Sequence, residues 1–182
     1  RWSRLAIRAR PAIGSPWAGD VHAEGNPHLH TDPRNLLEVA QALATRLQEA
    51  VPSQRTAIEQ RRAQFEVRLK AQLLQWERRV APLRGRTVAA QHSSFGYLWK
   101  WLGIIQVADM EPRPGMAPTP GHLQRLLDGL KNQPPMAVVV ASYQDPRSGR
   151  WLSGQLARQA PLLVLPATVN EDADGEGLIR WF

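Results

Sequence analysis

The feature that most constrains this sequence is the alternation of short apolar runs with helical segments after Gly85. The apolar runs predict strands, and the segments between them have the spacing of amphipathic helices. Such alternation favours a parallel sheet covered by helices and connected by right-handed crossovers. We expect strands at residues 87–91, 104–109, 137–141 and 162–165, and helices at residues 95–102, 119–130 and 149–159.

Two further helices are predicted upstream of the sheet, after a stretch with at most a short helix at residues 2–10. Asp32 and Pro33 favour a helix start, and an apolar stripe then continues to about Ala50. The next helix, over residues 54–81, would be about 42 Å long at 1.5 Å per residue. A helix of this length with a thin apolar seam is expected to bridge two lobes.

These elements together predict an α/β fold with two lobes joined by one long helix. The expected divisions are residues 1–53 for the remainder of an N-lobe, residues 54–82 for the linking helix and residues 83–182 for a C-lobe. In the C-lobe, a four-stranded parallel sheet is flanked by helices.

Composition limits the chemistry that the chain can carry. Without cysteine, a transition-metal site has to be built from histidine and carboxylate side chains. The net charge of +7 raises nucleic acid as a partner, but glutamates are interspersed among the arginines of residues 55–86. This pattern favours a solvated helix face over a phosphate-binding surface. No apolar run reaches the ~18 residues of a membrane helix.

Polar side chains gather where the predicted strands end, which is where open parallel sheets bind ligands. The residues concerned are His92, Tyr143, Gln144, Asp145, Asn170, Glu171, Asp172 and Asp174. One edge of the sheet therefore collects an imidazole and several carboxylates.

A second polar concentration precedes the first long helix. His22, His28 and His30 fall within nine residues, together with acidic side chains. Histidines clustered with acids in a loop are typical metal ligands, although the same residues also serve in turns and helix caps. From the residues alone, both interpretations stay open.

Several motifs resemble a known family when they are taken in order. They are Gly-Asn-Pro-His-Leu-His-Thr-Asp-Pro at residues 25–33, Gln-His-Ser-Ser-Phe-Gly-Tyr-Leu at residues 91–98 with Gly103, Glu-Pro-Arg-Pro-Gly at residues 111–115, Pro-Gly-His-Leu at residues 120–123 and Leu-Pro at residues 165–166. The sequence resembles the zinc and manganese substrate-binding proteins of bacterial ABC importers, the metal-binding cluster A-I family. The resemblance covers nearly the whole chain.

The resemblance implies a two-lobed protein that holds a divalent cation between its lobes. Carried over by motif, His28 from the N-lobe and His92 from the C-lobe are ligands. His30 is a further candidate, but it stands where many relatives have an aromatic residue, which favours packing beside the site. The C-terminal carboxylate ligand of the family would come from Glu171, Asp172 or Asp174, or be replaced by water. Because imidazole suits Zn²⁺ better than it suits Mn²⁺, Zn²⁺ is expected ahead of Mn²⁺ or Fe²⁺.

By the same resemblance, the chain is a non-enzymatic binding protein that captures Zn²⁺ and delivers it to a membrane permease. It is expected to be a monomer without nucleic-acid partners, periplasmic, or extracellular and membrane-tethered. An N-terminal segment with an earlier histidine ligand would lie upstream of Arg1. The alternative is a zinc-dependent hydrolase with a His/carboxylate metal site, for which Glu24 and Glu111 are candidate general bases.

Overall fold

The computed structural model describes residues 26–156, 160–169 and 177–182, which divide into two compact units. One unit combines the described residues up to Thr31 with Leu83–Thr168, and the other combines Asp32–Pro82 with the described residues that follow Thr168. The predicted division into two lobes and a linking helix over residues 54–82 stays a prediction. The short helix expected at residues 2–10 lies outside the described residues.

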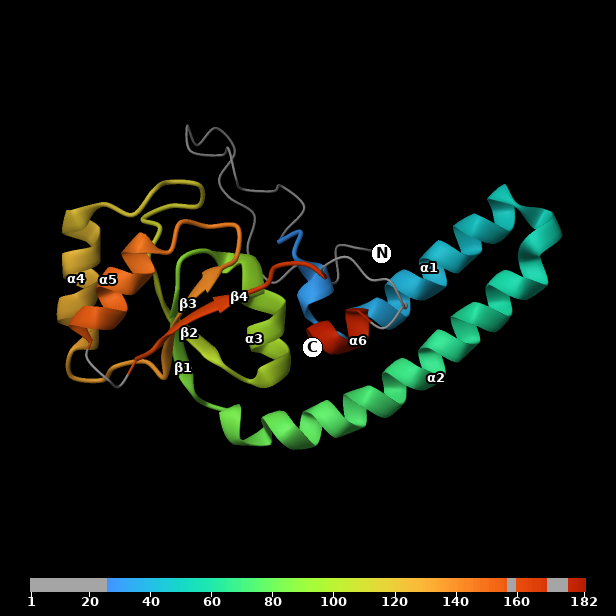
Figure 1. The fold of residues 1–182 in the computed structure, drawn as a ribbon, viewed down its shortest axis with the longest axis horizontal. Coiled ribbons are helices and arrows are strands. Elements are labelled where there is room, and N and C mark those ends of the chain that lie inside the picture. The colour runs from blue at the N-terminus through green and yellow to red at the C-terminus, as the bar shows by residue number, and fades with distance from the viewer. Residues whose placement is uncertain (1–25, 157–159, 170–176) are drawn as a thin grey trace. The chain divides into compact units, whose positions relative to one another are not determined.

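A four-stranded, all-parallel sheet forms the first unit, which confirms the predicted α/β class. The strands are β1 (Thr87–Ala90), β2 (Ile105–Asp109), β3 (Ala137–Ala141) and β4 (Leu162–Leu165), in the order β2-β1-β3-β4. The helices that alternate with them are α3 (Gly96–Leu102), α4 (Pro120–Leu130) and α5 (Arg147–Gln155). Helices α4 and α5 cover one face of the sheet and α3 lies on the other (Figure 1).

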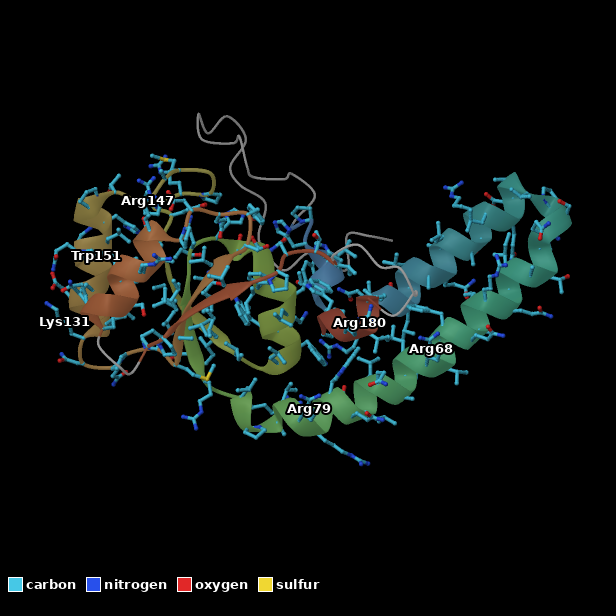
Figure 2. The ribbon with its side chains drawn as sticks, viewed as in Figure 1. Arg68, Arg79, Lys131, Arg147, Trp151 and Arg180 are labelled. Carbon is cyan, nitrogen blue, oxygen red and sulfur yellow. The ribbon has the colours of Figure 1, made fainter. Side chains whose placement is uncertain are left out.

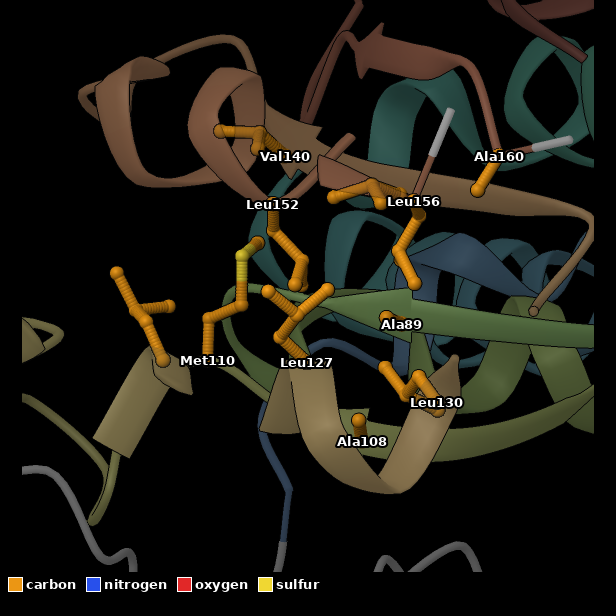
Figure 3. Packing of buried hydrophobic residues seen from close by; sticks show 11 residues of the cluster. Ala89, Ala108, Met110, Leu127, Leu130, Val140, Leu152, Leu156 and Ala160 are labelled. Atoms are coloured by element: carbon orange, nitrogen blue, oxygen red, sulfur yellow. The ribbon is translucent and has the colours of Figure 1, made fainter. Parts of the chain in front are cut away.

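The core of this unit lies between the sheet and the pair α4 and α5 (Figure 3). Val138 and Val140 point into it from the central strand β3, because alternate strand residues share a face. Leu152 meets them from α5 and is fully buried. The approach of α5 is close, since a Cβ added at Gly149 would lie 2.6 Å from a methyl of Val140 and 3.0 Å from one of Leu162.

Local sequence explains where these helices begin. The Thr119 hydroxyl accepts a hydrogen bond of 3.3 Å from the backbone N–H of His122, and Pro120 occupies the first turn, so α4 begins where it was predicted. Helix α5 begins at Arg147, two residues before the predicted start. There the Asp145 carboxylate accepts hydrogen bonds from the backbone and side chain of Arg147.

The second unit contains α1 (Asn35–Ala50), α2 (Arg55–Val80) and the short α6 (Gly177–Trp181). Of these three helices, the sequence analysis did not anticipate α6. Helix α2 agrees with the predicted long helix to within one residue at each end. The expected cap of α1 is wrong, because Arg34 occupies the N-cap position and no side chain caps the helix. The Asp32 carboxylate instead accepts hydrogen bonds from the Arg34 backbone at 3.0 Å and its guanidinium at 2.7 Å.

Two basic residues of α2, Arg62 and Lys70, have acidic partners on the same helix. Arg62 is hydrogen-bonded to both Glu59 and Glu66, and Lys70 lies 2.6 Å from Glu66. Other arginines, such as Arg79, extend from the helix surface (Figure 2). These pairs are three and four residues apart, as expected for a solvated helix face.

Candidate metal centre

The candidate site lies where the strands of the parallel sheet end. His92 follows β1, Glu111 follows β2 and Ala167 follows β4. The carboxyl ends of parallel strands meet at one edge, so residues far apart in the sequence come together there. The Asn-Pro-His motif of residues 26–28 belongs to the same compact unit and completes this group.

Hydrogen bonds explain how the Asn-Pro-His motif is held near the sheet. Asn26 donates from Nδ2 to the backbone oxygen of Ser93 at 3.0 Å, and its Oδ1 accepts from the backbone N–H of His28 at 2.9 Å. The hydroxyl and backbone N–H of Thr31 both donate to the backbone oxygen of His28. The following 3-10 turn, Leu29–Thr31, packs on α3. The structure therefore groups His28 with the sheet, whereas the sequence analysis assigned it to the N-lobe.

Three of the histidines considered as ligands lie close together. The ring centroids of His28 and His92 are 6.0 Å apart, and those of His28 and His30 are 6.1 Å apart. Two imidazoles that share a tetrahedral Zn²⁺ with Zn–N bonds of ~2.0–2.1 Å have centroids roughly 5 Å apart. The separation of the His28 and His92 centroids is therefore about 1 Å longer than in such a pair.

Hydrogen bonding sets the tautomer of His92. Its Nδ1 lies 2.8 Å from Oε2 of Glu111, and both side chains are largely buried. A carboxylate can only accept, so Nδ1 carries the proton and the lone pair of the neutral ring is on Nε2. A neutral imidazole binds a metal through its unprotonated nitrogen, which in His92 is Nε2.

His30 is fixed by a different partner. Its Nε2 lies 3.0 Å from the backbone oxygen of Ala167, just after β4. A carbonyl oxygen also only accepts, so Nε2 of His30 carries the proton and only Nδ1 could bind a metal in the neutral ring. This contact fits the expected role of packing beside the site, and it ties the histidine motif to the end of the sheet.

The remaining predicted ligands, Glu171, Asp172 and Asp174, lie outside the described residues. Within the part of the chain that the structure describes, no group of three or more histidine or acidic side chains is already arranged to hold a metal ion. Among the described residues, His28 and His92 therefore remain two candidate ligands at this edge.

Glu111 is one of the two candidate general bases of the alternative hydrolase. In the structure its carboxylate accepts hydrogen bonds from within the protein. Its Oε2 also accepts from the backbone N–H of Gly115 at 2.9 Å, in addition to the contact with His92. A cavity of about 110 Å³ beside it is lined by Gln91, His92, Ser93, Asp109, Glu111, Pro112, Arg113 and Pro114. The other candidate base, Glu24, lies outside the described residues.

Sequence reasoning missed the residues that position the histidines. These are Asn26, Thr31, Ser93 through its carbonyl, Ala167 through its carbonyl, and Glu111 as a partner of His92. The Asn-Pro pair was an available signal, because asparagine side chains accept from the backbone two residues on. Backbone acceptors such as the Ala167 oxygen leave no signal in the sequence.

The structure combines a parallel α/β sheet with histidines at its carboxyl edge, and imidazole is a donor that suits divalent transition metals. The chain belongs to the family described as zinc-uptake complex component A, periplasmic, whose model matches residues 6–182. This membership confirms the resemblance seen in the motifs. The family consists of uptake components and not of enzymes, which agrees with the expectation of a binding protein.

Several solved structures share the fold of this chain. A mutant of the laminin-binding adhesin Lmb from Streptococcus agalactiae has 19% identity and a TM-score of 0.73, over 99% of this chain and 65% of that one. The SBP FpvC from Pseudomonas aeruginosa, in complex with Mn²⁺, has 18% identity and a TM-score of 0.69, over 85% and 58%. A Cd-bound periplasmic metal-binding protein from Candidatus Liberibacter asiaticus has 15% identity and a TM-score of 0.69, over 87% and 61%.

The chain spans less than two thirds of the length of each of these proteins. No curated protein sequence matches it. Among the helices of the described residues, none is both long enough and apolar enough to cross a lipid bilayer.

Proposed function

We propose that this chain is part of the solute-binding component of a bacterial ABC importer, which captures Zn²⁺ and delivers it to a membrane permease. The observation that supports this most directly is the 6.0 Å separation of the His28 and His92 rings, with the lone pair of His92 on Nε2. The family description names zinc uptake and the periplasm. We therefore propose that the protein lies in the periplasm, or outside the cell and tethered to the membrane. We also propose that it is a monomer.

The proposed ligand set is His28 and His92, with His30 beside them and Glu171 or Asp172 as the source of a carboxylate. We propose Zn²⁺ over Mn²⁺ and Fe²⁺ because the proposed ligands that lie among the described residues are imidazoles, whereas Mn²⁺ prefers carboxylate and water. Related folds have been solved with Mn²⁺ and with Cd, so the preference of this chain has to be measured on the chain itself.

The test is a comparison of Zn²⁺ and Mn²⁺ affinity in three variants, measured by competition with a chromophoric chelator. His28→Ala and His92→Ala should each weaken Zn²⁺ binding by at least ~100-fold, more than the loss of a residue that only supports a ligand. His122→Ala is the control, because it removes an imidazole of the same unit whose Nε2 lies 2.9 Å from the backbone oxygen of Asp109 and which is not a proposed ligand. It should leave the affinity unchanged.

Two results would contradict the proposal. If either His28→Ala or His92→Ala binds Zn²⁺ as tightly as the unchanged protein, that histidine is not a ligand. If Mn²⁺ binds more tightly than Zn²⁺, the choice of metal is wrong. Delivery to a permease is tested separately, by the growth in zinc-poor medium of bacteria that depend on the full-length protein with or without His92→Ala.

A further inference from the structure

Glu111 holds two N–H groups with a single carboxylate oxygen. Its Oε2 lies 2.8 Å from Nδ1 of His92 and 2.9 Å from the backbone nitrogen of Gly115. The side chains of His92 and Glu111 are 11% and 13% exposed, so water does not screen this contact as it screens a surface ion pair. The two donors fix where the oxygen lies.

The backbone around Glu111 holds the carboxylate in place. The N–H of Glu111 donates to the Gln91 oxygen at 3.1 Å, which extends the pairing of β1 with β2 beyond the ends of both strands. The chain then turns through two prolines to Gly115, whose φ of +80° is a left-handed conformation that favours glycine. This turn directs the N–H of Gly115 back to the carboxylate. Glu111 is thus anchored at both its backbone and its side chain.

The Glu111 carboxylate acts on His92 through this hydrogen bond. Its hydrogen bond fixes the proton of His92 on Nδ1 and the orientation of the ring, and it increases the electron density on Nε2.

We infer that Glu111 is a positioning residue for His92: its carboxylate fixes the tautomer and the ring orientation in which Nε2 of His92 can bind a metal. This inference rests on the proposed function for its effect on affinity. Its effect on the His92 tautomer does not depend on metal binding.

Glu111→Ala and Glu111→Gln separate these effects. In Glu111→Gln, the amide oxygen can still accept from Gly115 and from His92, so geometry is kept while the negative charge is lost. In Glu111→Ala, neither N–H has this acceptor. Asp128→Asn is the matched control, because it removes a carboxylate from the same unit at the far end of α4, where its partner is Lys131.

Two readouts are needed. The first is the His92 tautomer in the metal-free protein at alkaline pH, from long-range ¹H–¹⁵N correlation NMR, with the signals assigned by the loss of one imidazole in His92→Gln. The second is Zn²⁺ affinity by chelator competition. Circular dichroism checks that each variant is folded.

We expect His92 to be protonated on Nδ1 in the unchanged protein, in Glu111→Gln and in Asp128→Asn, and to become a mixture of tautomers in Glu111→Ala. Zn²⁺ affinity should fall ~10–100-fold in Glu111→Ala, less in Glu111→Gln and not at all in Asp128→Asn. An unaltered His92 tautomer in Glu111→Ala would overturn the inference, whatever happens to affinity. If the unchanged protein binds no Zn²⁺, the proposed function fails, and the tautomer comparison still decides the role of Glu111.

Discussion

Replacing Gly149 with alanine tests the packing of α5 on the sheet. The added Cβ would lie 2.6 Å from Val140 Cγ2 and 3.0 Å from Leu162 Cδ1, both closer than ordinary carbon contacts. Val140 is 1% exposed and β-branched, so its methyl cannot turn away without meeting other core atoms. Overpacking of this kind destabilises by ~1–3 kcal/mol, and the helix propensity of alanine returns up to ~1 kcal/mol. With the full gain from helix propensity subtracted, the expected net loss in the free energy of unfolding is about 0–2 kcal/mol.

Gly154 offers a matched control in the same helix, because nothing lies within 4 Å of a Cβ added there. Gly154→Ala should therefore stabilise the protein, by up to ~1 kcal/mol. Urea denaturation monitored by tryptophan fluorescence measures both changes. The double variant Gly149→Ala with Val140→Ala should lose at least ~0.5 kcal/mol less than the sum of the single losses, because the clashing methyl is gone. Equal stabilisation by Gly149→Ala and Gly154→Ala would refute the reasoning.

Two smaller perturbations test the ends of α4 and α5. Thr119→Ala removes the acceptor for the His122 N–H and should destabilise by ~0.5–1 kcal/mol in urea denaturation, with Thr119→Ser close to the unchanged protein; equal losses in both would exclude a capping role. The side-chain hydrogen bond from Arg147 lowers the pKa of Asp145 below its ordinary value of 3.8, so Arg147→Ala should raise that pKa toward 3.8 in a ¹³C NMR titration. The stabilisation from this pair is complete above about pH 3.8 and is lost as the pH falls through the lowered pKa; an unchanged titration would show that Arg147 has no such effect.

The regular parts of the fold could be predicted because their signals are local. The residues of β3 and β4 were predicted to the residue, since each is an uninterrupted apolar run beside a proline or a polar turn. The start of α1 could not be predicted in this way. Asp32 is a good capping residue, but its side chain binds Arg34 and does not cap the helix. Capping preference describes an average, and a neighbouring guanidinium overrides it.

The candidate site, like the fold, could be predicted only in part from the sequence. The motifs indicated His28 and His92, and the strand-end rule placed His92 at the edge of the sheet. The partnership of His92 with Glu111 could not be predicted, because it depends on the register of β1 against β2 and on the turn that ends at Gly115. Residues that act through tertiary contacts carry no spacing of their own in the sequence.

The contacts of the candidate site close loops of very different length, which has a consequence for the order of folding. His92 and Glu111 are 19 residues apart, whereas His30 and Ala167 are 137 residues apart. Closing the longer loop in an unfolded chain costs about 1.7 kcal/mol more in entropy. We therefore expect the pair of His92 and Glu111 to form early, together with the local β1-α3-β2 segment. His28 and His30 join it only when the chain before α1 and the chain after α2 have come together. If the proposed function is right, zinc binding is gained in the last stage of folding, and a variant that delays this association delays zinc binding without slowing the formation of the sheet.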